Sequence, residues 1–171
     1  MAGYRIYTSL DPAKQEILQS AVDQVLSFDG ETADNGIYAL QGAAVAVNND
    51  TGLVEAIVGG RSQETSTYTL NRAFQSFRQP GSSIKPLIVY APALEEGYAS
   101  FSSVKDINVD AAKEPKADVA SLPGNWITLR QAVEKSRNGA AWWLFNEVTP
   151  EEGLSYLTQM QFDKIVPDDY N

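Results

Sequence analysis

One short stretch of the chain decides its fold, and it reads Arg78-Gln79-Pro80-Gly81-Ser82-Ser83-Ile84-Lys85-Pro86. The Pro80-Gly81 pair is typical of a turn, and the apolar residues that follow it predict a helix over residues 82–96. Residues three apart share one face of a helix, so the Lys85 amine lies within reach of the Ser82 hydroxyl. The pattern Ser-x-x-Lys therefore indicates a serine nucleophile, Ser82, with Lys85 as its proton acceptor.

Ser-x-x-Lys is a weak pattern by itself, because a serine at a helix start and a solvated lysine produce the same letters. It also occurs a second time, at residues 102–105, in a stretch that we interpret as irregular. For the chemistry Lys85 must lose its charge, which requires burial or a nearby cation that lowers its pKa. Pro86 has no N–H to donate to the Ser82 carbonyl, so we expect a distorted first turn.

The composition excludes several classes of function. The chain has 171 residues with 13 basic and 22 acidic side chains, and its net charge of -9 disfavours binding to nucleic acid. Cysteine and histidine are absent from the sequence, which excludes disulfides, thiol nucleophiles, Cys or His metal sites and a Ser-His-Asp triad within the chain. No apolar run reaches the about 18 residues of a membrane-spanning helix, so we expect no membrane contact within this chain.

Hydrophobic periodicity predicts an α+β fold. Asp11 followed by Pro12 is typical of a helix start, and Thr128 with Gln131 fits a capping box at another helix start. Residues 100–124 are poor in large apolar side chains, and we interpret them as a long irregular segment. The expected elements are an extended lead-in at 1–10, a helix at 11–29, a β-hairpin at 41–60, the helix at 82–96 and a helical region at 128–160.

The order of these motifs resembles a known family. Residues 71–73 and 78–86 are similar to the nucleophile segment of penicillin-binding proteins, most of all the bifunctional class A kind. Residues 7–12, 43–60 and 90–97 resemble the flanking segments of that family's transpeptidase domain. The whole chain therefore resembles the N-terminal portion of such a domain.

The family's second motif, Ser-x-Asn, has a counterpart in Ser136-Arg137-Asn138. The resemblance implies that Ser136 relays a proton to the leaving amine and that the Asn138 amide holds Lys85 and a substrate carbonyl. Both roles need short polar groups on a loop between two helices, and we interpret Asn138-Gly139 as the break between them. By itself the tripeptide is commonplace, and a serine at a helix end is the alternative interpretation.

Other side chains invite a functional interpretation less strongly. Trp126, Trp142 and Trp143 are candidates for a sugar-stacking surface, but two of them fall on one predicted helix, which favours a role in the core. Asp168-Asp169 is a carboxylate pair near the end of the chain, and we interpret it as part of a solvated tail.

The resemblance implies a penicillin-binding/serine β-lactamase-like transpeptidase fold of which only part is present, namely one antiparallel hairpin with packed helices. The family's third motif, Lys-[Ser/Thr]-Gly on a later strand, has no counterpart, since no lysine of this sequence is followed by Ser/Thr-Gly. We therefore expect the later strands to be missing and the C-terminal half of the domain to be a partner of this chain. We also expect the chain alone to be weakly active or inactive.

The resemblance further implies a peptidoglycan D,D-transpeptidase that forms an acyl-serine from D-Ala-D-Ala stem peptides and is inhibited covalently by β-lactams. No metal or organic cofactor is implied. The implied partners are peptidoglycan stem peptides and β-lactam antibiotics. The implied location is the extracytoplasmic face of the bacterial cell membrane, with the parent protein anchored by a segment that is not in this chain.

Two alternatives stay open. A serine β-lactamase or β-lactam-sensing domain uses the same two motifs, although no glutamate here has a context that suits activation of a hydrolytic water. A non-catalytic structural half-domain would leave a sheet edge unpaired, which predicts self-association and no labelling by penicillin.

Overall fold

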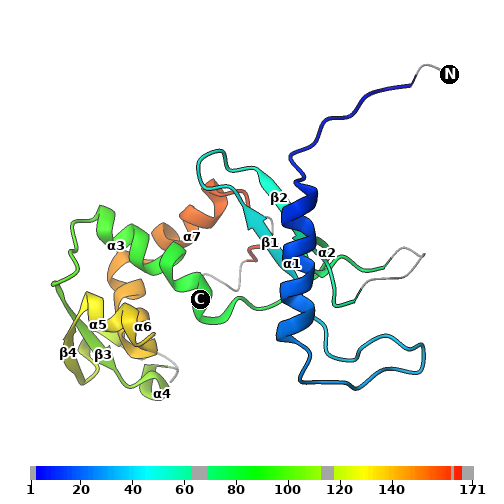
Figure 1. Ribbon diagram of the computed structural model, residues 1–171. Helices are drawn as coiled ribbons and strands as arrows, with labels where there is room; N and C mark the ends of the chain where they lie inside the picture. Colours follow the sequence, from blue (N-terminus) through cyan, green and yellow to red (C-terminus); the bar gives the residue numbers. More distant parts are fainter. Residues whose placement is uncertain (1–2, 63–68, 113–117, 163, 167–171) are drawn as a thin grey trace. The chain divides into compact units, whose positions relative to one another are not determined.

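The computed structural model describes residues 3–62, 69–112, 118–162 and 164–166. The chain divides into two compact units, Met1–Arg78 and Gln79–Asn171 (Figure 1). Each unit has its own helices and its own two-stranded antiparallel sheet. In the part of the chain that the structure describes, no helix is long and apolar enough to cross a membrane.

Helix α1 (Pro12–Val25) is the long helix of the first unit. The Asp11 carboxylate accepts hydrogen bonds from two amides of the first turn, at 2.9 and 3.2 Å, so the helix start expected there is confirmed. The helix ends earlier than the expected residue 29. The amides of Ser27 and Asp29 bond to carbonyls three residues back, so the chain tightens into turns after α1.

The hairpin of the first unit consists of β1 (Ala44–Val47) and β2 (Val54–Val58), which pair antiparallel. The Asn48 carboxamide accepts hydrogen bonds from two amides of the connecting loop, at 2.9 and 3.1 Å. Gly52 has a φ of 71°, which a residue without a side chain adopts at little cost. Turn chemistry in the loop thus sets the pairing of the two strands.

Helix α1 covers the outer edge of β2. The Gln15 side chain exchanges two hydrogen bonds of 2.9 Å with the N–H and C=O of Ile57. The Asp11 amide bonds to the Glu55 carbonyl at 2.8 Å, one step along the same edge. These side-chain and backbone groups take the place of a third strand. The short helix α2 (Arg72–Gln75) completes the described elements of this unit.

The second unit begins with three short helices where one helix over 82–96 is expected: the 3-10 helix η1 (Gly81–Ile84), the π-helix η2 (Pro86–Tyr90) and α3 (Ala91–Glu95). The Lys85 amide bonds to the Ser82 carbonyl, three residues back, and Pro86 has no N–H for the α-helical bond to that carbonyl. The Ala91 amide then bonds to the Pro86 carbonyl, five residues back. The distortion expected from the proline is therefore present, and it extends over two turns.

The interpretation of residues 100–124 as one irregular segment is wrong. The described residues between 103 and 128 form β3 (Ser103–Ile107), α4 (Val109–Ala112), η3 (Val119–Ser121) and β4 (Gly124–Thr128). Strands β3 and β4 pair antiparallel. The sequence signal is weak because the buried residues of β3, Val104 and Ile107, are three apart rather than two. In the described part of the chain, the α+β fold thus has two small antiparallel sheets instead of the single hairpin expected.

Helices α5 (Leu129–Glu134), α6 (Asn138–Val148) and α7 (Pro150–Gln159) follow β4. The capping box expected at the start of α5 is confirmed. The Thr128 hydroxyl accepts from the Gln131 amide at 3.2 Å, and the Gln131 side chain accepts from the Thr128 amide at 3.0 Å. This reciprocal pair fixes the direction in which the chain leaves β4.

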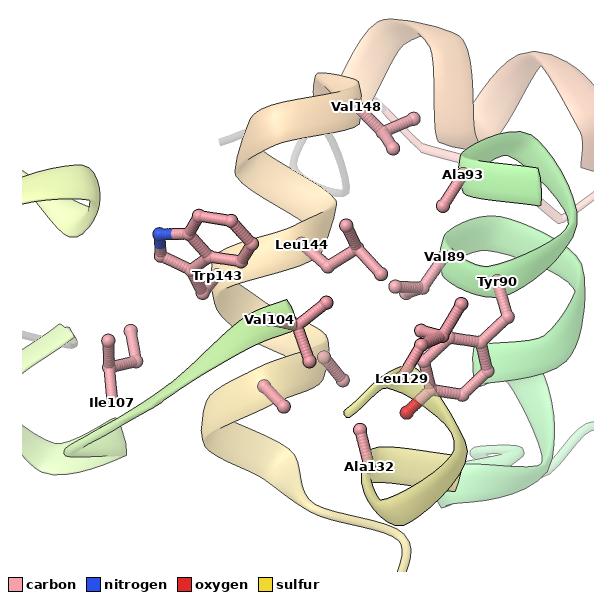
Figure 2. Close-up of a cluster of buried hydrophobic side chains, with 12 residues drawn as sticks. Val89, Tyr90, Ala93, Val104, Ile107, Leu129, Ala132, Trp143, Leu144 and Val148 are labelled. Atoms are coloured by element: carbon pink, nitrogen blue, oxygen red, sulfur yellow. The ribbon is translucent and has the colours of Figure 1, made fainter. Parts of the chain in front are cut away.

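The core of the second unit lies between η2, α3, β3, α5 and α6 (Figure 2). Leu144 and Val104 are fully buried at its centre. Trp143 belongs to the core and Trp142 packs against it, as the sequence interpretation favours. Trp126 is instead 62% exposed and meets the Trp143 ring edge-on at 5.7 Å. Because a buried large apolar side chain contributes about 1.5–3 kcal/mol, this core fixes the elements around it.

Gly139 lies in the first turn of α6, so the interpretation of Asn138-Gly139 as a break is wrong. A Cβ atom at position 139 would lie 2.1 Å from the Ile107 carbonyl oxygen of β3. The missing side chain therefore permits the close approach of α6 to β3, rather than a turn. Gly153 has the same role in α7, where a Cβ atom would lie 2.4 Å from the Ile88 carbonyl oxygen.

Candidate active site

Three of the four predicted site residues meet at the Lys85 amine. Its Nζ lies 3.0 Å from the Ser136 carbonyl oxygen, 3.3 Å from the Ser136 Oγ and 2.5 Å from the Asn138 Oδ1. Lys85 follows η1, Ser136 lies between α5 and α6, and Asn138 is the first residue of α6. The hydrogen bonds to these three oxygens hold the amine in one place at the meeting point of three elements.

Ser82 lies in η1, one turn before Lys85, and is exposed. Residues three apart eclipse one another in a 3-10 helix, so Lys85 follows Ser82 on the same side of the chain. The Ser82 hydroxyl makes no hydrogen bond to any residue that the structure describes, Lys85 included. The neighbouring Ser83 hydroxyl is bonded to the Pro80 carbonyl at 2.6 Å. Of the two serines in this turn, Ser82 is thus the one whose hydroxyl is not bonded to any described residue.

Burial lowers the pKa of the Lys85 ammonium below its ordinary value. The side chain is half-buried, and the groups bonded to its amine are neutral oxygens of Ser136 and Asn138 rather than carboxylates. Desolvation disfavours the charged form of an amine, and no carboxylate among the described residues is bonded to the amine to favour that form. The shift has the direction that a proton acceptor needs.

Ser136 has a left-handed backbone conformation, with a φ of 48°. It follows Lys135, the C-cap of α5, and two backbone bonds enclose it. The Ser136 amide bonds to the Val133 carbonyl at 3.0 Å, and the Arg137 amide bonds to the Ala132 carbonyl at 2.9 Å. This pair of bonds is the Schellman motif, in which glycine is the usual residue at the left-handed position. The loop therefore holds a serine where glycine would be relaxed.

One charged pair beside the site is missing from the sequence interpretation. The Arg137 Nε lies 2.7 Å from the Asp106 Oδ2, and the Nη2 of the same guanidinium also contacts that oxygen. The Asp106 side chain is only 8% exposed. A carboxylate in β3 between the buried Val104 and Ile107 is the signal that would have indicated it, had β3 been recognised as a strand.

Other sequence candidates do not join this site. The second Ser-x-x-Lys tetrad, residues 102–105, runs into β3, and the Lys105 amine is bonded to the Ala120 carbonyl at 3.2 Å. Within the described ranges of the chain, no cluster of His, Cys, Asp or Glu is arranged to hold a metal ion. Asp168-Asp169 lies outside the described residues.

The chain belongs to the penicillin-binding protein transpeptidase domain family, whose model matches residues 42–170. The match confirms the family that the motifs indicate. It extends over the segment that carries all four predicted site residues, Ser82, Lys85, Ser136 and Asn138.

Individual members of the family are similar to the chain over most of its length. It is 34% identical to penicillin-binding protein 4 of Bacillus subtilis, over 98% of the chain and 25% of the relative. It is 32% identical to penicillin-binding protein 1A of Clostridium perfringens, over 90% of the chain and 25% of the relative. The chain thus spans about a quarter of the length of these curated relatives.

A solved structure shares the fold. The PonA1 protein from Mycobacterium tuberculosis, in complex with penicillin V, superposes with a TM-score of 0.67 at 22% sequence identity. The similarity covers 96% of this chain and 41% of the PonA1 chain. The α+β fold indicated by the motifs is therefore confirmed as that of a penicillin-binding protein.

Proposed function

We propose that Ser82 is the acyl-accepting nucleophile of a peptidoglycan D,D-transpeptidase. The observation that carries this proposal is the Lys85 amine, held by Ser136 and Asn138 one turn after an exposed serine. Burial lowers the Lys85 pKa, so part of the amine population is uncharged at a lower pH than for an ordinary lysine. Family membership supports the same chemistry.

The proposed reaction has two halves. The uncharged Lys85 amine takes the proton of the Ser82 hydroxyl as the serine oxygen attacks the carbonyl between the two D-alanines of a stem peptide. The C–N bond breaks, Ser136 relays a proton to the departing amine, and terminal D-alanine leaves. An amine from a neighbouring stem peptide then attacks the acyl-serine, and Ser82 recovers its proton. Asn138 keeps Lys85 and the substrate carbonyl in register.

β-Lactams fit the same proposal, because their strained amide reacts with the serine and the acyl group stays attached after the ring opens. The proposed partners are therefore peptidoglycan stem peptides and β-lactam antibiotics. The proposed location is the extracytoplasmic face of the bacterial cell membrane, where stem peptides are cross-linked. No lysine of this sequence is followed by Ser/Thr-Gly, the family's third motif, so we expect slow acylation by the chain alone.

Mass spectrometry after treatment with benzylpenicillin tests the nucleophile. We expect one penicilloyl group on the peptide that contains Ser82, none in Ser82→Ala, and unchanged labelling in Ser83→Ala. Ser83 is the matched control, because it lies in the same turn but its hydroxyl is already bonded to the Pro80 carbonyl. Labelling that persists in Ser82→Ala would exclude the proposal. An adduct that lasts minutes or longer indicates a transpeptidase rather than a hydrolase.

The pH dependence of acylation tests the proton acceptor. Only the uncharged Lys85 amine accepts a proton, so the rate should rise with pH and level off above the Lys85 pKa. Because burial lowers that pKa, the midpoint should fall below the ordinary value for lysine. Lys85→Arg, which keeps its charge, should label slowly at every pH. A wild-type rate that is flat or falls as the pH is raised would contradict the assignment of Lys85 as the proton acceptor.

A further inference from the structure

The residue in the middle of the Ser-x-Asn motif faces away from Lys85. Ser136 and Asn138 bond to the Lys85 amine, while the guanidinium of Arg137 between them bonds to Asp106 of β3. Arg137 has extended backbone angles, with a φ of -64° and a ψ of 119°, between the left-handed Ser136 and the first helical residue, Asn138. The motif thus contacts the amine on one side and β3 on the other.

The contact with β3 is built from a buried carboxylate. The Asp106 side chain is 8% exposed, whereas that of Arg137 is 52% exposed. Both the Nε and the Nη2 of Arg137 contact the same carboxylate oxygen, which restricts the orientation of the guanidinium more than a single contact would. A buried carboxylate keeps its charge at low cost only when it is paired, so the strand and the loop each require the other.

The same strand also fixes the segments on either side of the loop. Just before β3, the carbonyls of Ser102 and Ser100 accept the amides of Leu129 and Arg130, at 2.8 and 2.9 Å, and so hold the start of α5. After the loop, Gly139 packs against the Ile107 carbonyl at the end of β3. The residues just before β3 thus hold the start of α5, Asp106 of β3 holds the middle of the loop, and the end of β3 packs against the start of α6.

Resting on the proposed function, we propose that Asp106 and Arg137 are positioning residues, a latch that holds Ser136 and Asn138 against the Lys85 amine. Arg137, the middle residue of the motif, then contributes to the geometry of the site. It keeps Ser136 in its left-handed conformation, which persists only where the surroundings determine it. Neither latch residue touches the reacting atoms, so both act through Lys85, Ser136 and Asn138.

The test compares two arginines with the same change of charge. Arg137→Gln breaks the latch, while Arg130→Gln removes an exposed pair with Glu134 that lies at 3.9 Å on the surface of α5. We expect Arg137→Gln to slow penicilloylation of Ser82 by about tenfold or more, because small misplacements of catalytic groups have effects of this size. Arg130→Gln should react like the wild type. Arg137→Lys, which keeps the charge and one contact, should recover part of the rate.

The pKa of Lys85 is a second measurement, which distinguishes an effect on positioning from a loss of stability and does not depend on acylation of Ser82. The pKa of Lys85 is followed by the carbon NMR signal next to its amine, in protein that circular dichroism shows to be folded. In Arg137→Gln the loop loosens, the amine gains water, and its pKa should rise towards the ordinary value, because burial is what lowers it. In Arg130→Gln it should stay unchanged. This titration reports on the latch even if Ser82 is never acylated.

The outcomes are distinct. If neither the wild type nor any variant is labelled at Ser82, the proposed function fails. A Lys85 pKa that changes in Arg137→Gln and not in Arg130→Gln would still support the latch. If Arg137→Gln matches the wild type in both rate and titration, the latch is wrong. If Arg137→Gln does not fold, Asp106→Asn/Arg137→Gln removes the unpaired carboxylate. The latch then predicts a folded but slower protein, and a wild-type rate in that double variant would overturn it.

Discussion

The ends of helices α3 and α5 have the same backbone design but different residues at the critical position. After α3, the amides of Gly97 and Tyr98 bond back to the carbonyls of Leu94 and Ala93, at 3.2 and 3.0 Å. The end of α5 repeats these two bonds around Ser136. The left-handed residue is a glycine with a φ of 101° in the first case and a serine with a φ of 48° in the second.

The difference between Gly97 and Ser136 shows that the candidate site lowers the stability of the fold through backbone strain. A left-handed backbone costs a residue with a side chain roughly 1–2 kcal/mol, and glycine almost nothing. Gly97 therefore ends its helix without strain, whereas Ser136 keeps the strain together with a hydroxyl 3.3 Å from the Lys85 amine. The serine side chain makes a contact with the Lys85 amine that glycine could not make.

The end of α7 is a reference for this comparison, because its left-handed residue lies outside the candidate site. After α7, Gln161 has a φ of 63°, and the amides of Gln161 and Phe162 bond back to Thr158 and Leu157 at 3.0 and 2.9 Å. The Gln161 side chain is exposed and bonds to no residue that the structure describes. A left-handed residue is therefore no sign of a site by itself. Ser136 differs from Gln161 because its side chain also contacts the half-buried Lys85 amine.

The largest effect is expected from Ser136→Gly, which gives α5 the helix end of α3. Acylation of Ser82 should slow about a hundredfold, since a positioned proton relay contributes roughly that factor or more. The free energy of unfolding, measured by urea denaturation, should rise by about 0.5–1 kcal/mol, because the backbone strain is relieved. Ser136→Ala is the control, with the same loss of rate and no gain in stability. A glycine variant that acylates normally would remove Ser136 from the mechanism.

The reverse exchange, Gly97→Ser, should affect stability alone. A side chain in the left-handed conformation at the end of α3 should lower the free energy of unfolding by about 1–2 kcal/mol, because no contact compensates for the strain. Penicilloylation of Ser82 in folded protein should be unchanged. Urea denaturation gives the first quantity and mass spectrometry the second. A stability equal to that of the wild type would show that the two helix ends are not equivalent.

The smallest effect is expected at the reference position, the end of α7. Gln161→Gly should raise the free energy of unfolding by about 0.5–1 kcal/mol, the strain relieved minus the extra backbone entropy that glycine loses. The matched control is Met160→Gly, one residue earlier, where φ is -80° and glycine relieves no left-handed strain. Stabilisation by both glycines, or by neither, would mean that left-handed strain does not explain the difference between α3 and α5.

Sequence reasoning found the parts of the fold that depend on neighbouring residues. The caps at Asp11 and Thr128 and the distortion at Pro86 follow from chemistry within one helical turn, so a short stretch of sequence contains the cause. Lys85, Ser136 and Asn138 were indicated as partners by the order of two motifs, and the structure brings these three together. Their catalytic roles remain predictions.

The parts that sequence reasoning missed depend on contacts between distant segments. Strand β3 has buried residues that do not alternate, and only its pairing with β4 makes it a strand. Turn propensity predicts a break at Gly139, whereas the structure needs glycine there because the Ile107 carbonyl of that strand lies too close for a side chain. The contact between Asp106 and Arg137 was invisible for the same reason, because one partner lay in a segment interpreted as irregular.

The side chain of Gln15 has a consequence for how the first unit behaves in concentrated solution. Exposed strand edges act as templates on which other chains add and aggregate. By bonding to both backbone groups of Ile57, Gln15 leaves that part of the β2 edge with nothing to offer an incoming strand. The Gln15 carboxamide thus blocks the addition of another strand at this position, where proteins more commonly place a charged residue or a proline.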